Sequence, residues 1–168
     1  MLEALPLAIF IAFLVGAACS DVATMTIPNW LSLALAALFP LSALATGIPA
    51  ATVGLHLAFG FAVLAVGFLL FQFGFMGGGD AKLIAAASVW TGLGAFLPFL
   101  VWTMIAGGVM AAMLLAARFQ LKPNDARPAF VNRLLKPRGG VPYGVAIMAG
   151  GVAALGALPF AAAPLTLP

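Results

Sequence analysis

Charged residues are scarce in this chain: 7% of its 168 residues are Asp, Glu, Lys or Arg, whereas 65% are hydrophobic. Soluble domains carry about 25% charged residues, so an ordinary water-exposed surface cannot be built from this composition. The apolar residues also form blocks close to the ~20 residues that a helix needs to cross a hydrocarbon core. We therefore expect an integral membrane protein. No polar linker divides the chain, and residues 1–168 are expected to form a single domain.

Cysteine is almost absent as well. The single Cys19 can form no internal disulfide and no multi-cysteine zinc site, and we expect neither a metal nor another cofactor. No Lys or Arg precedes Lys82, so the basic flank of a signal peptide is missing. The first apolar segment is therefore predicted to be a retained helix.

Glycine and proline divide the apolar sequence into six predicted helices. Their approximate bounds are Leu5–Ser20, Trp30–Thr46, Ala51–Phe73, Asp80–Thr91, Ala95–Ala117 and Pro142–Ala162. The fourth is short for a full crossing, at roughly 20 Å, and Gly92 and Gly94 could form the turn after it. The sequence predicts an all-α polytopic fold.

The basic residues indicate the orientation. Six of the seven lie in one polar loop between the fifth and sixth segments: Arg118, Lys122, Arg127, Arg133, Lys136 and Arg138. Lys and Arg mark the cytoplasmic side of a membrane. Lys82 falls on the same side as this loop only if the fourth segment also crosses. We therefore predict six transmembrane helices with both termini outside, and anionic lipid is the simplest partner for the basic loop.

Two of the four acidic residues are unusual. Glu3 and Asp125 are most simply solvated charges, whereas Asp21 ends the first predicted span and Asp80 begins the fourth. The predicted topology places both at the cytoplasmic ends of their helices. Charges near the membrane interior are costly and indicate a functional site. The alternative is structural: Asp80 could be a helix N-cap, and Asp21 could end its span among headgroup water.

Two carboxylates held close together in a low-dielectric site share one proton. The ionised one can take a proton from water while the protonated one polarises a peptide carbonyl. Such a pair can hydrolyse a peptide bond without a metal or a covalent intermediate. The three glycines before Asp80 lack a Cβ and allow close approach of a helix or an extended substrate. A phosphate-binding loop is rejected because the Lys-Ser/Thr ending is missing.

Three motifs in order carry a resemblance to a known family. Asp21 is followed at a short interval by Ile27-Pro28-Asn29. The second motif is Gly77-Gly78-Gly79-Asp80, continued by Ala81-Lys82-Leu83, and the third is Val141-Pro142-Tyr143-Gly144-Val145-Ala146. With these motifs the sequence resembles the type IV prepilin peptidases, which belong with the GxGD membrane aspartyl proteases. The resemblance is strongest to the short, peptidase-only form linked to Flp (tight-adherence) pili.

The resemblance implies that Asp21 and Asp80 are the catalytic aspartates. It implies an aspartic-type endopeptidase that removes the leader peptide of prepilins at the cytoplasmic face of the bacterial inner membrane, ahead of the hydrophobic pilin helix. Its expected partners are a prepilin and membrane lipids, with no nucleic acid. Active-site support is expected from the remaining motif residues, namely Pro28, Asn29, Gly77, Gly78, Gly79, Lys82, Pro142, Tyr143 and Gly144.

Two departures from the family pattern matter. Family members often carry basic residues between the first aspartate and Ile-Pro-Asn, where this chain has Ala23, Met25 and Thr26. The longer family members also carry a cysteine-rich zinc domain and N-methylate the new terminus. The stretch from Asp21 to Asn29 is too short for such a domain, and no methyltransferase activity is predicted.

Several motif residues also have a structural interpretation. Pro28 biases Ile27 toward an extended backbone, and Asn29 or a neighbour can cap the second helix. Pro142 suits a first helical turn, and Tyr143 suits an interfacial anchor.

Lys82 and His56 have simpler explanations too. Lys82 is two residues from Asp80 and is expected on another helix face, snorkelling to the interface; an influence on the protonation of the pair is the alternative. His56 is interpreted as a packed or interfacial histidine.

Two other functions remain as alternatives. A small transporter or proton relay could use the two acids, but it requires a polar path across the bilayer. A non-catalytic subunit of pilus or secretion assembly would use both carboxylates as caps.

Overall fold

The computed structural model describes residues 4–124, 126–137 and 139–161. Within these ranges the regular secondary structure is entirely helical, which confirms the all-α prediction. The helices are α1 (Ala4–Thr24), α2 (Asn29–Ala45), α3 (Ala50–Gln72), α4 (Gly78–Gln120), α5 (Ala129–Leu134) and α6 (Tyr143–Ala153), followed by the 3₁₀ turn η1 (Leu155–Ala157). By length and composition, α1, α3 and α4 could each cross a membrane, and α2 and α6 are shorter apolar helices.

Proline begins most of these helices. Residues Pro28, Pro49, Pro128 and Pro142 occupy the N-cap positions of α2, α3, α5 and α6. Proline fixes its own φ near the helical value and lacks the N–H that would be unpaired at a helix start. Pro142 therefore stands one residue earlier than the predicted first-turn position.

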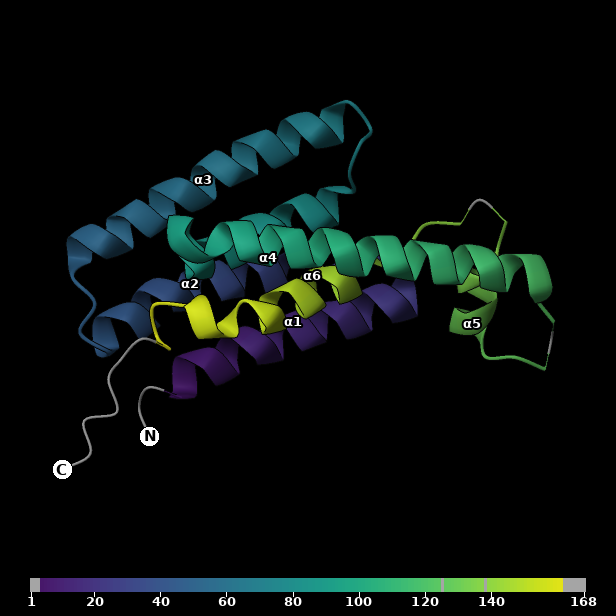
Figure 1. The fold of residues 1–168 in the computed structure, drawn as a ribbon, viewed down its shortest axis with the longest axis horizontal. Coiled ribbons are helices and arrows are strands. Elements are labelled where there is room, and N and C mark those ends of the chain that lie inside the picture. Colours follow the sequence, from purple (N-terminus) through teal and green to yellow (C-terminus); the bar gives the residue numbers. More distant parts are fainter. Residues whose placement is uncertain (1–3, 125, 138, 162–168) are drawn as a thin grey trace.

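The predicted turn between the fourth and fifth segments lies inside α4. Gly92 has φ 56° and ψ −170°, outside the helical region, and the helix turns back on itself there (Figure 1). The part before it, residues 78–91, would be about 21 Å long at 1.5 Å per residue. The two parts, 78–91 and 93–120, correspond to the fourth and fifth predicted helices, so the prediction of a glycine turn is confirmed.

One helix boundary was wrong, and one helix was not predicted. The last helix ends at Ala153 and gives way to η1, whereas the sequence predicted a helix from Pro142 to Ala162; Ala162 itself lies outside the described residues. The basic loop contains the short helix α5, which was not predicted. Three charged residues weighed above, Glu3, Asp125 and Arg138, also lie outside the described residues.

The core is centred on Trp90, which is fully buried in the first part of α4. Its ring centroid lies 5.5 Å from that of Phe10, 5.7 Å from that of Phe39 and 5.6 Å from that of Phe160. Its indole N–H donates to the Leu35 carbonyl over 2.8 Å. A buried indole needs such a partner, and this one ties α4 to α2.

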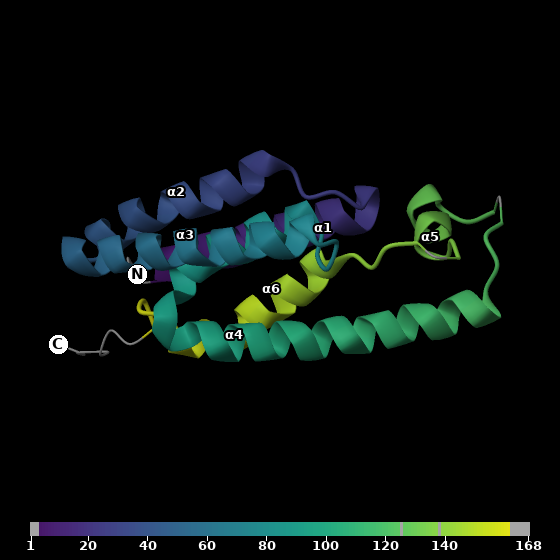
Figure 2. The ribbon, with the colours of Figure 1, turned by 90° about the horizontal axis from the view of Figure 1, so that it is seen from above.

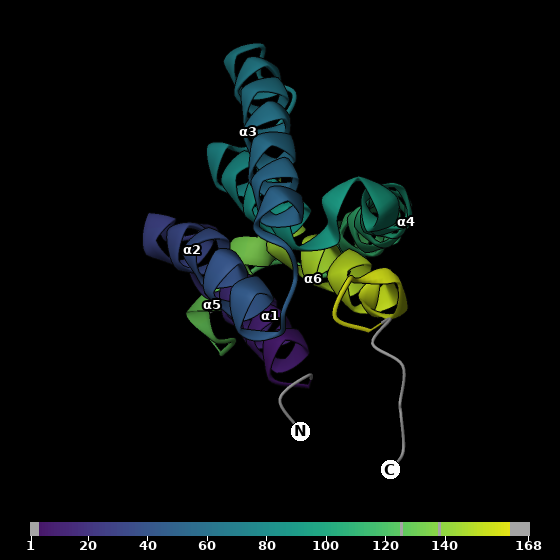
Figure 3. The same ribbon diagram turned by 90° about the vertical axis from the view of Figure 1, so that its left-hand side faces the viewer.

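The elements that carry the acidic residues meet at one end of the bundle. The C-terminal end of α1 and the N-terminal ends of α4 and α6 lie on the same side, to the right in Figure 1. Figure 2 shows the same arrangement from above, with the last turns of α4 and α5 extending beyond that end. Viewed along the bundle, α3 rises away from α1, α2 and α6 (Figure 3).

Candidate active site

Two carboxylates from different helices occupy this end. Asp21 lies in the last two turns of α1 and is only 6% exposed. Asp80 is half-buried in the first turn of α4. The Asp80 carboxylate is close enough to Asp21 for their charges to interact. The structure thus brings together the two acids that the sequence singled out, although 59 positions separate 21 from 80.

The third motif holds Asp21. The backbone N–H of Gly144, at the start of α6, donates to Asp21 Oδ2 over 2.8 Å. A Cβ at Gly144 would lie 3.0 Å from Asp21 Cβ and 3.3 Å from the Ala17 carbonyl oxygen. Both distances are tighter than ordinary van der Waals contact. The absence of a side chain at Gly144 therefore allows α6 to approach α1 closely enough for this hydrogen bond.

Asp80 is held by its own helix terminus. Gly77, not Asp80, occupies the N-cap position of α4, which corrects the N-cap interpretation. Asp80 is the third helical residue, and its carboxylate lies beside the Gly77 backbone, where acidic side chains at this position commonly face the N-cap N–H. A Cβ on Gly77 would lie 2.7 Å from Asp80 Oδ2. The positive end of the helix dipole favours a carboxylate here.

The other two glycines of this motif accommodate different neighbours. A Cβ at Gly79 would lie 3.3 Å from the Cβ of Ile27, so the Ile-Pro-Asn segment rests against the start of α4. A Cβ at Gly78 would lie 3.3 Å from the Phe71 ring of α3. The first and second motifs are therefore in direct contact beside Asp80.

Lys82 makes a contact that the sequence did not predict. Its ammonium donates to Asn29 Oδ1 over 3.0 Å. Asn29 is the first residue of α2 and does not cap it, because Pro28 occupies the N-cap and no side-chain cap bond forms. The sequence suggested that Asn29 or a neighbour caps α2, and the neighbour Pro28 does so; for Lys82 it suggested an interfacial role. Residues 53 positions apart can be paired only once the helices are placed, and no local signal could have revealed this bond.

Two residues of the third motif contact other parts of the bundle. Pro142 is buried, whereas Tyr143 is 41% exposed. The Tyr143 ring lies against the second part of α4, where a Cβ on Gly107 would come within 2.7 Å of it. In this structure Tyr143 packs α6 against α4, and Gly144 is the residue of this motif that contacts a carboxylate.

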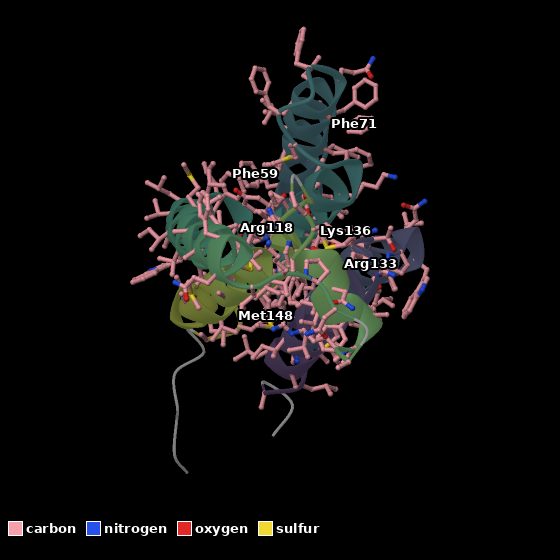
Figure 4. All side chains as sticks on the ribbon, turned by 90° about the vertical axis from the view of Figure 1, so that its right-hand side faces the viewer. Phe59, Phe71, Arg118, Arg133, Lys136 and Met148 are labelled. Atoms are coloured by element: carbon pink, nitrogen blue, oxygen red, sulfur yellow. The ribbon has the colours of Figure 1, made fainter. Side chains whose placement is uncertain are left out.

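The basic loop covers the same end of the bundle. Arg118 donates to the carbonyl oxygens of Leu134 and Gly140, at 2.8 and 2.7 Å, and Arg133 donates to the carbonyl of Ala23 near the end of α1. Figure 4, which faces this end, shows Arg118, Arg133 and Lys136 over the middle of the bundle. Cations suit the unpaired carbonyls of helix C-termini. Arg133 therefore fastens the loop onto the end of α1, and Arg118 fastens it onto the end of α4.

The chain between Asp21 and Ile27 carries backbone strain. Met25 has φ 57°, the one non-glycine positive φ among the described residues, and its N–H donates to the Asp21 carbonyl over 2.7 Å. A positive φ is unfavourable for a residue with a side chain. The sequence contained no signal for this conformation, since glycine or asparagine would be the usual residue. Among the described residues, no three His, Cys, Asp or Glu side chains gather into a possible metal site.

The fold and site define a helical membrane protein with a pair of neighbouring carboxylates at one end of the bundle. Comparison with protein families gives a more specific result: the model of the type IV leader peptidase family matches residues 8–112. This match covers more than half of the chain and includes both Asp21 and Asp80. The chain belongs to the type IV leader peptidase family. No significant similarity to a curated protein or to a solved structure was found.

Proposed function

We propose that this protein is an aspartic endopeptidase that removes the leader peptide from Flp-type prepilins, with Asp21 and Asp80 as its catalytic pair. The family membership supports a leader peptidase acting on a prepilin. The observation that carries the catalytic assignment is the convergence of the three motifs. Asp21 accepts a hydrogen bond from Gly144, the Asp80 carboxylate lies beside Gly77, and Gly79 is in contact with Ile27.

The proposed reaction uses the two carboxylates in complementary protonation states. The ionised one takes a proton from a water molecule, whose oxygen attacks the scissile carbonyl carbon. The protonated one donates a hydrogen bond to the carbonyl oxygen and supports the tetrahedral intermediate. Collapse of this intermediate breaks the C–N bond as a proton passes to the leaving amine. The pair then returns to its starting state without a covalent enzyme intermediate.

The proposed location is the cytoplasmic face of the bacterial inner membrane. Both carboxylates lie at the end of the bundle that is covered by the basic loop, and basic residues favour the cytoplasmic side. The reversal at Gly92 supports separate crossings by the two parts of α4, and hence six crossings with both termini outside. We also propose that the chain does not methylate the new N-terminus, because a single cysteine cannot build the four-cysteine zinc domain of the longer relatives.

The direct test replaces each carboxylate by its amide. We expect Asp21→Asn and Asp80→Asn each to lower prepilin processing by at least about 1,000-fold, since loss of a catalytic group typically costs several kcal/mol. Processing is measured by the mobility shift of a co-expressed Flp-type prepilin, and membrane accumulation of each variant is followed by immunoblot. The matched control is Asp125→Asn, which makes the same change at the third aspartate of the chain and should leave processing unchanged. Efficient processing by either active-site variant would overturn the proposal.

A further inference from the structure

An elongated apolar groove begins beside the carboxylate pair. It lies between α2, α3 and the first part of α4, and its volume is about 620 Å³. Asn29 and Lys82 line one end, and Pro40, Leu57 and Val89 line the other. The distance along α2 from Asn29 to Pro40 is about 16 Å at 1.5 Å per residue. The groove therefore extends along about half the ~30 Å thickness of a hydrocarbon core.

The walls of the groove suit a helix as the occupant. Small residues from three helices line it: Ser32, Ala36, Ala37, Gly60, Ala85 and Ala86. Small side chains allow two helix backbones to approach closely in a membrane. Figure 3 shows α3 standing away from α2, although the two are consecutive in the chain. Direct α2–α3 packing does not fill the space between them.

Ser32 provides independent evidence for an absent partner. It is 6% exposed, it lines the groove, and its Oγ is the one buried side-chain polar atom without a hydrogen-bond partner among the described residues. Other buried helical hydroxyls bond to a preceding carbonyl, as Ser88 does with Ala85 and Thr103 with Phe99. An unpaired buried hydroxyl is costly. A polar group on a docked segment would satisfy it.

The groove is also continuous with the candidate active site. Lys82, at one end of the groove, is two residues from Asp80 and bonded to Asn29, the last residue of the Ile-Pro-Asn motif. A helix in the groove would present the chain that precedes it at the level of the carboxylates. A lipid acyl chain would satisfy the apolar walls, but it has no group to pair with Ser32.

We propose that this groove binds the apolar helix of the substrate on the C-terminal side of the scissile bond. This inference rests on the proposed leader-peptidase function, and it adds a docking surface for the part of the substrate that remains after cleavage. The helix lies against α2, α3 and the first part of α4, and the Ser32 hydroxyl pairs with a polar group on it. Docking of this helix in the groove determines which peptide bond of the substrate lies beside Asp21 and Asp80.

The test compares two exposed alanines on different helices. Ala37 lines the groove, whereas Ala112 lies on the second part of α4 and lines neither this groove nor the smaller one between α3 and α4. A photo-crosslinking residue is placed at each position in the Asp80→Asn background, so that a co-expressed Flp-type prepilin stays uncut. We expect crosslinked prepilin from position 37 at ten or more times the yield from position 112. Crosslinks only to lipid or to a second copy of the enzyme would overturn the proposal.

A second measurement uses cleavage. Ala37→Trp and Ala112→Trp are compared on the prepilin and on a truncated peptide that ends a few residues after the cleavage site. We expect Ala37→Trp to lower the ratio of prepilin cleavage to peptide cleavage about tenfold, and Ala112→Trp to preserve it. Ser32→Ala should raise KM for the prepilin about fivefold, the effect of one lost hydrogen bond.

The outcomes separate the two proposals. If the unmodified protein processes the prepilin but both tryptophan variants show the same ratio, the docking proposal is wrong and the function stands. If the unmodified protein processes neither substrate, the leader-peptidase function itself is wrong.

Discussion

The two ends of the helix bundle both depend on glycine, but for different reasons. At one end, Gly77, Gly79 and Gly144 leave room around two carboxylates and their neighbours. At the other, Gly92 provides a positive φ at which α4 reverses. The first end concentrates charge, whereas the second contains the single histidine and aromatic rings. At the candidate active site, the missing side chains of the glycines leave room for close packing. At the opposite turn, glycine allows the positive φ that the reversal of α4 requires.

His56 packs against the Gly92 turn at the second end of the bundle. Its Nδ1–H donates to the Val89 carbonyl over 2.8 Å, and its ring stacks on Phe39 with centroids 5.0 Å apart. A Cβ on Gly92 would overlap the same ring. The histidine thus packs against the turn and satisfies a carbonyl just before it, in agreement with its interpretation as a packed residue. We assign it no catalytic role.

The largest expected effect in this comparison belongs to Gly92→Ala. Its side chain would overlap His56 and adopt an unfavourable positive φ, so we expect a loss of about 3 kcal/mol of stability. The measurement is thermal unfolding of the purified protein in detergent. Gly94→Ala is the matched control, since a Cβ there meets nothing within 4 Å. In the double variant His56→Ala/Gly92→Ala we expect only partial recovery, because the positive φ remains; equal melting temperatures for Gly92→Ala and Gly94→Ala would contradict this account.

Gly144→Ala should have a smaller effect on stability and a direct effect on activity. The added methyl would lie 3.1 Å from Asp21 Oδ2 and would push α6 away from the carboxylate. We expect at least a tenfold loss of prepilin processing, or about 1.4 kcal/mol in the activation free energy. Gly108→Ala, in open space on α4, is the control and should retain activity. Unchanged processing by Gly144→Ala would show that the Gly144–Asp21 hydrogen bond does not support catalysis.

The smallest expected effect concerns the Lys82–Asn29 bond. It is solvent-exposed and joins a charged donor to a neutral acceptor, so its contribution should be near 1 kcal/mol or less. Lys82→Met and Asn29→Ala should each lower processing about threefold, and the double variant should be little worse than either single variant. The processing rates of the unmodified protein, the two single variants and the double variant give the coupling free energy between Lys82 and Asn29. Additive losses would mean that the two residues act independently.

The sequence predicted the helices well because their signals are local. Apolar length, proline at helix starts and glycine turns depend on neighbouring residues, and the Gly92 break followed from such a signal. The short helix α5 and the early end of α6 were missed. A single turn of helix within a polar loop is a weak pattern. The early end of α6 did have a local signal, since Gly156 and Pro159 follow Ala153 and both residue types commonly end helices.

The sequence by itself determined the membrane character, the helix order and the two acidic residues of interest. Those conclusions follow from composition and spacing, which require no knowledge of distance between helices. Only the tertiary structure decided that Gly144 binds Asp21, that Lys82 binds Asn29 and that the Ser32 hydroxyl has no partner within the described part of the chain. Each of these depends on how helices far apart in sequence pack. Side-chain volumes and missing Cβ atoms determine that packing through contacts that no local pattern contains.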